Sequence, residues 1–298
     1  MLSAIPSYTI GDLVNKPNSD LPFELIRFET IEEPDVEEVH KHLFYEVLWI
    51  DAGSSKQVID YNEYELTPQT LFFISPGQVH SFEEWRDVKG GCVFFTEGFF
   101  LLNSRNTDML FELSFLDNFY ADPALNLSDT DFAQIRQTIH LLEEEHQRVD
   151  ASDVILQSLL HILLAQVQRC VDARLAETPS KRYVVIYKQF KRLLDEHFAK
   201  GRTAIEYAEE LNITPHHLNF VTKQTCGKTA TEVIRGRSLL EAKRLLTFTD
   251  LSISDVAGEL GFFDSSYFAK VFRQEEGISP IQFRQTMSEK YRKKSTSF

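Results

Sequence analysis

The sequence predicts an α+β protein, with an antiparallel β-domain first and an all-helical domain last. Short β-branched and aromatic runs fill positions 23–100 and are separated by turn-forming residues, which is typical of a small β-barrel or double-sheet jelly roll. From position 128 onward, apolar residues recur at spacings of three and four, the period of amphipathic helices. A helix-turn-helix pattern then occurs twice, about fifty residues apart.

The composition fits a folded chain of two or three domains. The chain has 298 residues, of which 43% are hydrophobic and 26% charged, so it is not disordered by composition. Its three cysteines contain no CxxC pair, which argues against a disulfide framework or a thiolate metal site. The N-terminus lacks the pattern of a signal peptide, and no apolar run reaches membrane-spanning length. We therefore expect a cytoplasmic protein that does not contact a membrane.

The charge is distributed unevenly along the chain. The formal net charge is -14, which by itself disfavours a polyanionic partner. Residues 1–180 carry 11 basic and 31 acidic side chains, whereas residues 181–298 carry 20 basic and 14 acidic ones, so the two parts have charges of -20 and +6. Only the C-terminal part is therefore expected to contact phosphates.

Residues 1–127 are predicted to form the β-domain. Turn-forming residues at 51–55 and 76–78 interrupt its apolar runs. The runs expected to form strands are 23–28, 44–50, 56–61, 70–75 and 91–95.

Residues 128–176 are predicted to form two helices. Ser128 and Asp131 make a capping box before the first. Its apolar face has the residues Phe132, Ile135, Ile139 and Leu142, and that of the second has Leu156, Leu159, Leu160, Leu163 and Val167. Such helices either cover the β-domain or form a self-association surface. The polar, proline-containing segment 177–182 is expected to be a linker.

Residues 183–298 are predicted to contain the two helix-turn-helix units. In the second unit, at 252–273, Ser252 and Asp255 form a capping box, Gly261 ends the first helix and Asp264 caps the next. The first unit, at 203–223, repeats this pattern with Thr203 and Glu206 in the capping box. A connecting helix is expected over 232–248. Two such units predict two helices that enter DNA grooves.

The second unit and its flank resemble the AraC family of bacterial transcription regulators. The matching residues are Ser266, Tyr267, Phe268, Lys270, Phe272, Arg273, Gly277, Ser279, Pro280, Phe283 and Arg284. The resemblance implies a sequence-specific regulator of transcription, activator or repressor, that binds double-stranded DNA and responds to a small-molecule effector. It also implies a homodimer formed through the helices of 128–176, and it leaves open a contact with RNA polymerase.

The resemblance also implies which side chains contact DNA. The base-reading candidates are His216, Asn219 and Phe220 in the first unit and Ser265, Ser266, Ala269 and Lys270 in the second. Asn219 has the donor and acceptor that pair with an adenine edge, and Lys270 suits guanine or phosphate. Lys223 and Arg273 are the phosphate candidates. Phe220 departs from the family, which commonly has arginine at that position.

A second resemblance concerns the β-domain. Two segments, His40 to Gly53 and Pro76 to His80, resemble the two cupin motifs, and family members often carry a cupin domain as the effector sensor. Cupin enzymes bind a divalent metal with a quartet like the one formed here by His40, His42, Glu46 and His80. We expect these residues to line the effector pocket without a metal or other cofactor. The alternative is a cupin-type metalloprotein, with or without enzymatic activity, whose helical part is used for docking.

Overall fold

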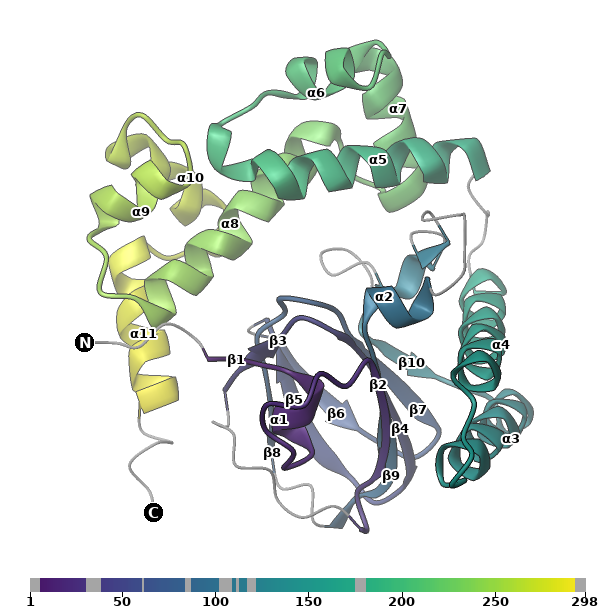
Figure 1. Ribbon diagram of the computed structural model, residues 1–298. Helices are drawn as coiled ribbons and strands as arrows, with labels where there is room; N and C mark the ends of the chain where they lie inside the picture. Colours follow the sequence, from purple (N-terminus) through teal and green to yellow (C-terminus); the bar gives the residue numbers. More distant parts are fainter. Residues whose placement is uncertain are drawn as a thin grey trace. The chain divides into compact units, whose positions relative to one another are not determined.

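The computed structural model describes residues 6–30, 39–60, 62–83, 87–101, 109–110, 113–116, 122–174 and 181–292. The chain forms two compact units, one of Ile5–Thr178 and one that contains Pro179–Phe298. The first unit contains β-sheets and the second is helical (Figure 1), which confirms the predicted α+β class.

The N-terminal unit is built on a five-stranded antiparallel sheet of order β10-β7-β4-β9-β2. Its strands are β10 (Ala124–Asn126), β7 (Thr70–Ile74), β4 (Tyr45–Ala52), β9 (Lys89–Phe95) and β2 (Phe23–Arg27). A three-stranded sheet has the order β6 (Asn62–Leu66), β5 (Ser55–Ile59) and β8 (His80–Glu83), and β1 (Ser7–Tyr8) pairs in parallel with β3 (Lys41–His42). The five predicted runs correspond to β2, β4, β5, β7 and β9, so the double-sheet prediction is confirmed.

Alternation along β4 divides the core into two layers. Leu48 and Ile50 join the cluster that includes Ile59 and Leu66 of the smaller sheet, whereas Val47 and Trp49 join the cluster on the opposite side. Successive side chains of a strand point to opposite faces, so both faces of β4 are buried. One face is covered by the second sheet and the other by helices.

Those helices are α3 (Asp129–His146) and α4 (Asp153–Asp172), which pack side by side (Figure 1). The described part of this unit also contains the shorter helices α1 (Ile10–Leu13), α2 (Glu97–Phe100) and η3 (Ser114–Leu116). The expected apolar faces are turned inward, with Ile139 of α3 and Leu160 of α4 fully buried. Ser128 caps α3 as predicted.

The leucine face of α4 covers the sheet, which is one of the two roles expected for these helices. Leu163 is 0% exposed, and Leu156, Leu160 and Val167 are buried with it against the sheet. Leu159 is partly buried against the same cluster. A side chain that is already buried within its own chain has no surface left to offer a partner, so a homodimer through 128–176 stays a prediction that needs another face of these helices.

The outer face of α4 is also apolar. Ile155 and Ile162 are 48% and 49% exposed. With the inner leucines they give an 18-residue window a mean hydropathy of 1.4, so this helix meets the length and composition of a membrane span. This agreement rests on length and composition alone, and the inner face of α4 is part of the unit's own core, so the absence of a membrane contact stays a prediction.

Strand β6 was missed in the sequence because its residues are mostly polar and exposed. It lies at the edge of the smaller sheet and pairs only with β5, with Asn62 opposite Ile59 and Leu66 opposite Ser55. Only Leu66 of this strand is buried. Pairing with β5, rather than an apolar pattern of its own, makes this segment a strand.

The C-terminal unit consists of helices. They are α5 (Lys181–His197), η4 (Phe198–Lys200), α6 (Ala204–Glu210), α7 (Pro215–Cys226), α8 (Ala230–Phe248), α9 (Ile253–Glu259), α10 (Ser265–Glu276) and α11 (Pro280–Arg292). Thr203 and Ser252 form the predicted capping boxes, and Asp264 caps α10. Most of the predicted linker, 177–182, lies outside the described residues.

Helix α8 joins the two helix-turn-helix units. Arg237 of α8 pairs with Asp195 of α5, Nε to Oδ1 at 2.9 Å, and its guanidinium lies 3.8 Å from the centre of the Phe198 ring. On the other side, Arg235 pairs with Glu275 of α10 at 2.8 Å, and Lys243 with Glu276 at 3.2 Å. These contacts tie α8 to α5 and η4 and to α10 of the second helix-turn-helix unit, and α8 also packs against α6 and α7 of the first.

Two glycines allow direct contact between the segment before the first helix-turn-helix unit and the turn of the second. Gly201 precedes α6 and Gly261 follows α9, and both have positive φ, 63° and 75°. A Cβ atom on Gly261 would lie 2.6 Å from the carbonyl oxygen of Ala199 and 2.7 Å from the amide nitrogen of Gly201. Glycine is therefore required at Gly261 for both conformation and space.

Candidate nucleic-acid interface and effector domain

Helices α7 and α10 occupy the same position in the two helix-turn-helix units. Each begins at a capped N-terminus and ends at a left-handed glycine, Gly227 or Gly277. Leu218 and Val221 of α7 are buried, as are Phe268 and Phe272 of α10. The remaining face of each helix is available to a groove, as in other helix-turn-helix proteins.

On α7, the predicted DNA residues differ in their surroundings. His216 and Lys223 are exposed. Phe220 is 43% exposed, and its ring packs edge-on against Tyr183 of α5, with ring centroids 5.5 Å apart. Phe220 therefore supports the position of α7 on α5 as well as presenting an apolar surface.

Asn219 has a structural role that was missed in the sequence. Its Oδ1 accepts a hydrogen bond from the backbone N–H of Ala230, the first residue of α8, at 2.9 Å. The first turn of a helix has N–H groups without partners inside the helix, so Asn219 satisfies one of them. The Asn219 acceptor is thus engaged within the chain, and its pairing with an adenine edge stays a prediction.

A comparison of the two repeats in the sequence could have indicated this structural role of Asn219. In the second unit, Ala269 stands where the first has Asn219, and Pro280 stands where it has Ala230. Proline has no N–H to satisfy, so no acceptor is needed at position 269. The paired difference between the repeats thus marks Asn219 as a capping residue.

On α10, Ser266, Lys270 and Arg273 are exposed, whereas Ser265 and Ala269 are half-buried. Within the described part of the chain, no salt bridge joins Lys270 or Arg273 to an acidic side chain, so both positive charges remain available to DNA. Tyr267, which was not among the predicted DNA residues, is 58% exposed.

In the N-terminal unit, the structure brings the predicted quartet together. His42, Glu46 and His80 come from β3, β4 and β8 and are buried. Glu46 Oε2 lies 3.3 Å from His42 Nε2 and 4.0 Å from His80 Nε2. His40 pairs with His80 through two backbone hydrogen bonds, and their ring centroids are 4.4 Å apart.

This cluster fits a divalent metal ion. One ligand atom from each of His42, Glu46 and His80 lies within 4.8 Å of the other two. Two imidazoles and one carboxylate are a ligand set used for zinc and for non-haem iron.

A fourth group, Cys92 of β9, contacts the same carboxylate. Its thiol donates to Glu46 Oε1 at a distance of 3.1 Å. Burial, followed by the charge of Glu46 and the hydrogen bond to it, raises the pKa of the Cys92 thiol well above its usual value. The alternation of β9 was the available signal, since Cys92 and Phe94 point into the core between the two sheets.

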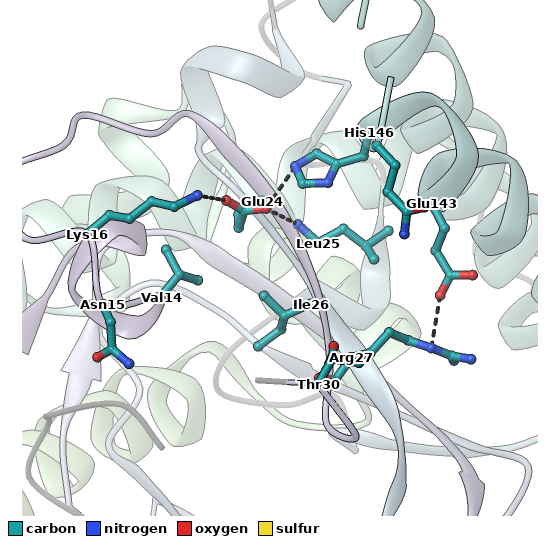
Figure 2. Close-up of a pocket in the computed structure, with 11 residues that line it drawn as sticks. Val14, Asn15, Lys16, Glu24, Leu25, Ile26, Arg27, Thr30, Glu143 and His146 are labelled. Carbon is teal, nitrogen blue, oxygen red and sulfur yellow. Dashed lines mark hydrogen bonds and ion pairs between the residues drawn. The ribbon is translucent and has the colours of Figure 1, made fainter. Parts of the chain in front are cut away.

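A cavity of about 440 Å³ lies elsewhere in this unit, between β2, the segment after α1 and the end of α3. Figure 2 shows its polar lining, in which Lys16 and His146 approach Glu24 from two sides. His146 Nε2 lies 2.8 Å from Glu24 Oε1, and Arg27 lies 3.4 Å from Glu143. The quartet is not part of this lining, so the predicted pocket residues and the cavity are separate.

The Glu24 carboxylate is held in its charged form. Burial raises the pKa of Glu24, but the hydrogen bond and charge of His146, the Leu25 N–H and the charge of Lys16 together bring it below its usual value. The cavity therefore presents a fixed negative charge next to the Lys16 and Arg27 cations.

Comparison with known proteins agrees with this architecture. Residues 26–178 match the model of the AraC-like ligand binding domain, and residues 207–286 match that of a helix-turn-helix domain. The HTH-type transcriptional activator RhaR of Escherichia coli O1:K1 / APEC is 28% identical over 261 residues, which cover 86% of this chain and 90% of RhaR. RhaR of Cronobacter sakazakii is 27% identical over 254 residues, covering 83% and 86%.

A solved structure of ToxT from Vibrio cholerae O395 aligns with 90% of this chain and 98% of ToxT, at 15% identity and a TM-score of 0.41. The family models together span both structural units of the chain. The chain therefore belongs to the AraC family of DNA-binding transcription regulators, with an AraC-like ligand binding domain before its helix-turn-helix domain.

Proposed function

We propose that one chain reads DNA with α7 and α10 in successive major grooves on one face of the duplex. The observation that carries this proposal is the duplicated helix-turn-helix, with its two copies fixed to each other by α8 and by the Gly201–Gly261 contact. Two rigidly joined reading helices can both contribute binding free energy only when their separation matches one turn of the DNA duplex, about 34 Å. The basic charge of residues 181–298 supports the same assignment.

We further propose that successive segments of the chain have different functions. Residues 1–127 sense a small-molecule effector, 128–176 form a homodimer, 177–182 connect the units and 183–298 bind DNA. The protein acts in the cytoplasm without catalysing a reaction, and it affects transcription through a contact with RNA polymerase. An enzyme with a helical docking part is not favoured, because the relatives bear the name of transcriptional activators.

The outer face of α4 supports the homodimer. Ile155, Ser158, Ile162, Ala165 and Arg169 follow one another at spacings of three and four, and all five are exposed. This spacing forms one stripe along a helix, and the small Ser158 and Ala165 let a second helix approach closely. Exposed isoleucines in such a stripe favour a protein partner. We propose that two copies pair through this stripe.

The cavity of Figure 2 is our candidate for the effector site. Its volume is within the range of small-molecule pockets, and its charged groups are already positioned by ion pairs. Cations at Lys16 and Arg27 and carboxylates at Glu24 and Glu143 suit a small polar molecule with both donors and acceptors. Since α3 lines the cavity and packs on α4, a ligand here acts next to the proposed dimer helix.

The paired-groove proposal predicts a footprint of about two helical turns for one protomer. Residues 181–298 alone are expected to give this footprint, because the acidic N-terminal part adds no attraction for DNA. Hydroxyl-radical footprinting on a duplex selected from a random pool measures it. Protection restricted to one major groove would refute paired docking.

The second prediction separates base reading from phosphate contact. Lys270→Ala is expected to cost about 1 to 3 kcal/mol on the selected duplex and to relax preference at one or two base pairs. Arg273→Ala should weaken binding to selected and scrambled duplexes alike and reduce the salt slope by about one. Titrations of both variants at several salt concentrations distinguish the two roles. Equal losses of Lys270→Ala on both duplexes would move Lys270 to the phosphate contacts.

Asn219→Ala serves as the structural comparison in these titrations. Loss of its bond to Ala230 is expected to lower the free energy of unfolding of the C-terminal unit by about 1 kcal/mol. A loss of DNA affinity without any loss of stability would return Asn219 to the base-reading residues.

The third prediction tests the dimer. Ile155→Asp together with Ile162→Asp is expected to give a folded monomer, because two charges in an apolar seam oppose pairing. Sedimentation velocity measures the mass and circular dichroism the fold. Ile205→Asp, an equally exposed isoleucine of α6, is the control and should remain dimeric. A dimer that survives the double substitution would place the interface elsewhere.

The fourth prediction concerns the cavity. In a thermal-shift screen of small polyols, amino acids and carboxylic acids, a compound that stabilises the wild type should no longer stabilise Glu24→Gln, which removes the fixed negative charge. Glu144→Gln is the control, since Glu144 lies on the same α3 helix outside the cavity lining. A compound that stabilises all three proteins equally binds somewhere else.

A further inference from the structure

We propose that His42, Glu46 and His80 bind a divalent transition-metal ion inside the N-terminal unit, and that the Cys92 thiol positions the Glu46 carboxylate. This inference reverses our expectation that the quartet is metal-free. It concerns the N-terminal unit only and does not rest on the proposed mode of DNA binding.

The first argument is the position of the imidazole protons. His42 Nδ1 lies 2.8 Å from the carbonyl oxygen of Phe44, and His80 Nδ1 lies 3.2 Å from that of Gln78. A carbonyl oxygen only accepts hydrogen bonds, so each Nδ1 carries the proton of its ring. In this tautomer, the Nε2 atom of each ring is the atom that can present a lone pair to the interior.

Both lone pairs point toward a third acceptor. Glu46 Oε2 lies 3.3 Å from His42 Nε2 and 4.0 Å from His80 Nε2. One ligand atom from each of these residues lies within 4.8 Å of the other two. All three side chains are buried, where polar atoms without partners are costly.

An additional proton resolves only part of this problem. A proton on His42 Nε2 would be shared with Glu46 Oε2 at 3.3 Å, whereas His80 Nε2 lies 4.0 Å from that oxygen, too far for a hydrogen bond. A cation among the three atoms satisfies all of them at once. The carbonyl partners of the two Nδ1 atoms are the outer contacts that typically orient metal-binding histidines.

Cys92 completes this arrangement. Its thiol donates to Glu46 Oε1, which leaves Oε2 directed at the histidines. Cys92 is thus a positioning residue for the ligand carboxylate. Because the ligands come from β3, β4 and β8, the ion would join strands of all three sheets.

The test uses tag-free, full-length protein that has been stripped with chelator and dialysed. Titration with Zn²⁺ or Co²⁺, followed by elemental analysis, is expected to give about one equivalent. His42→Ala and His80→Ala should lose it, while His140→Ala, an exposed histidine of α3, should keep it. Less than a tenth of an equivalent in the wild type, or full binding by both alanine variants, would overturn the proposal.

A second measurement covers the case in which a buried histidine variant does not fold. Excess Zn²⁺ at about one hundred times the dissociation constant should raise the melting temperature of the stripped wild type by about 5 to 10 °C, and chelator should reverse the shift. Glu46→Gln, which keeps the side-chain volume, should lose this shift. A wild type that is insensitive to both metal and chelator would contradict the site.

Co²⁺ also tests the role of Cys92. If Cys92 acts as a hydrogen-bond donor, the Co²⁺ protein should show no intense thiolate-to-cobalt charge-transfer band in the near ultraviolet. Cys92→Ala, which removes the donor to Glu46, should then bind Co²⁺ about 10- to 100-fold more weakly with the same stoichiometry. An intense band that disappears in Cys92→Ala would make Cys92 a ligand and would refute its positioning role.

Discussion

The N-terminal unit depends on the burial of both faces of one strand, β4. Its odd-numbered side chains, Val47 and Trp49, pack toward α3 and α4, and its even-numbered ones, Leu48 and Ile50, pack toward the smaller sheet. A shift of one residue in its register would exchange the two sets. The same alternation sets the side chains of Glu46 and Asp51 on opposite faces of the strand.

These two carboxylates have different structural roles because their surroundings differ. Glu46 is buried beside two histidines and a thiol, in a place suited to a cation. Asp51 accepts from Trp49, from Arg27 of β2 at 3.0 Å and from Arg136 of α3 at 2.6 Å, and so ties the sheet to the helix. One strand thus supports both the interior cluster and the helix that borders the cavity.

The C-terminal unit depends on a different constraint, the fixed relation between two copies of one motif. Arg237 stabilises the side of α8 that meets the first copy, and Arg235 and Lys243 stabilise the side that meets the second. The copies are not equivalent in detail. Asn219 caps α8 in the first copy, whereas Pro280 removes the need for such a cap in the second. Divergence between the repeats therefore reflects helix capping as well as base reading.

The sequence by itself determined the features that depend on local physics. Capping boxes, such as those of Thr203 and Ser252, and apolar periodicity act within one or two helical turns, so they identified the helices and the duplication. Apolar runs identified β2, β4, β5, β7 and β9, which supply most of the strand residues of the core. Charge counting separated an acidic unit from a basic one.

Only the tertiary structure decided which face of each helix or strand is already buried or bonded within the chain. The leucines of α4 and its outer isoleucines are equally apolar in the sequence, and burial against the sheet distinguishes them. Likewise, Asn219 has the same chemistry whether it faces a base or the N–H of Ala230. Cys92 lies 46 positions from Glu46, and strand pairing brings them to 3.1 Å. Such contacts join residues of different elements, so the pattern within one helix or strand gives the face of a side chain but not its partner.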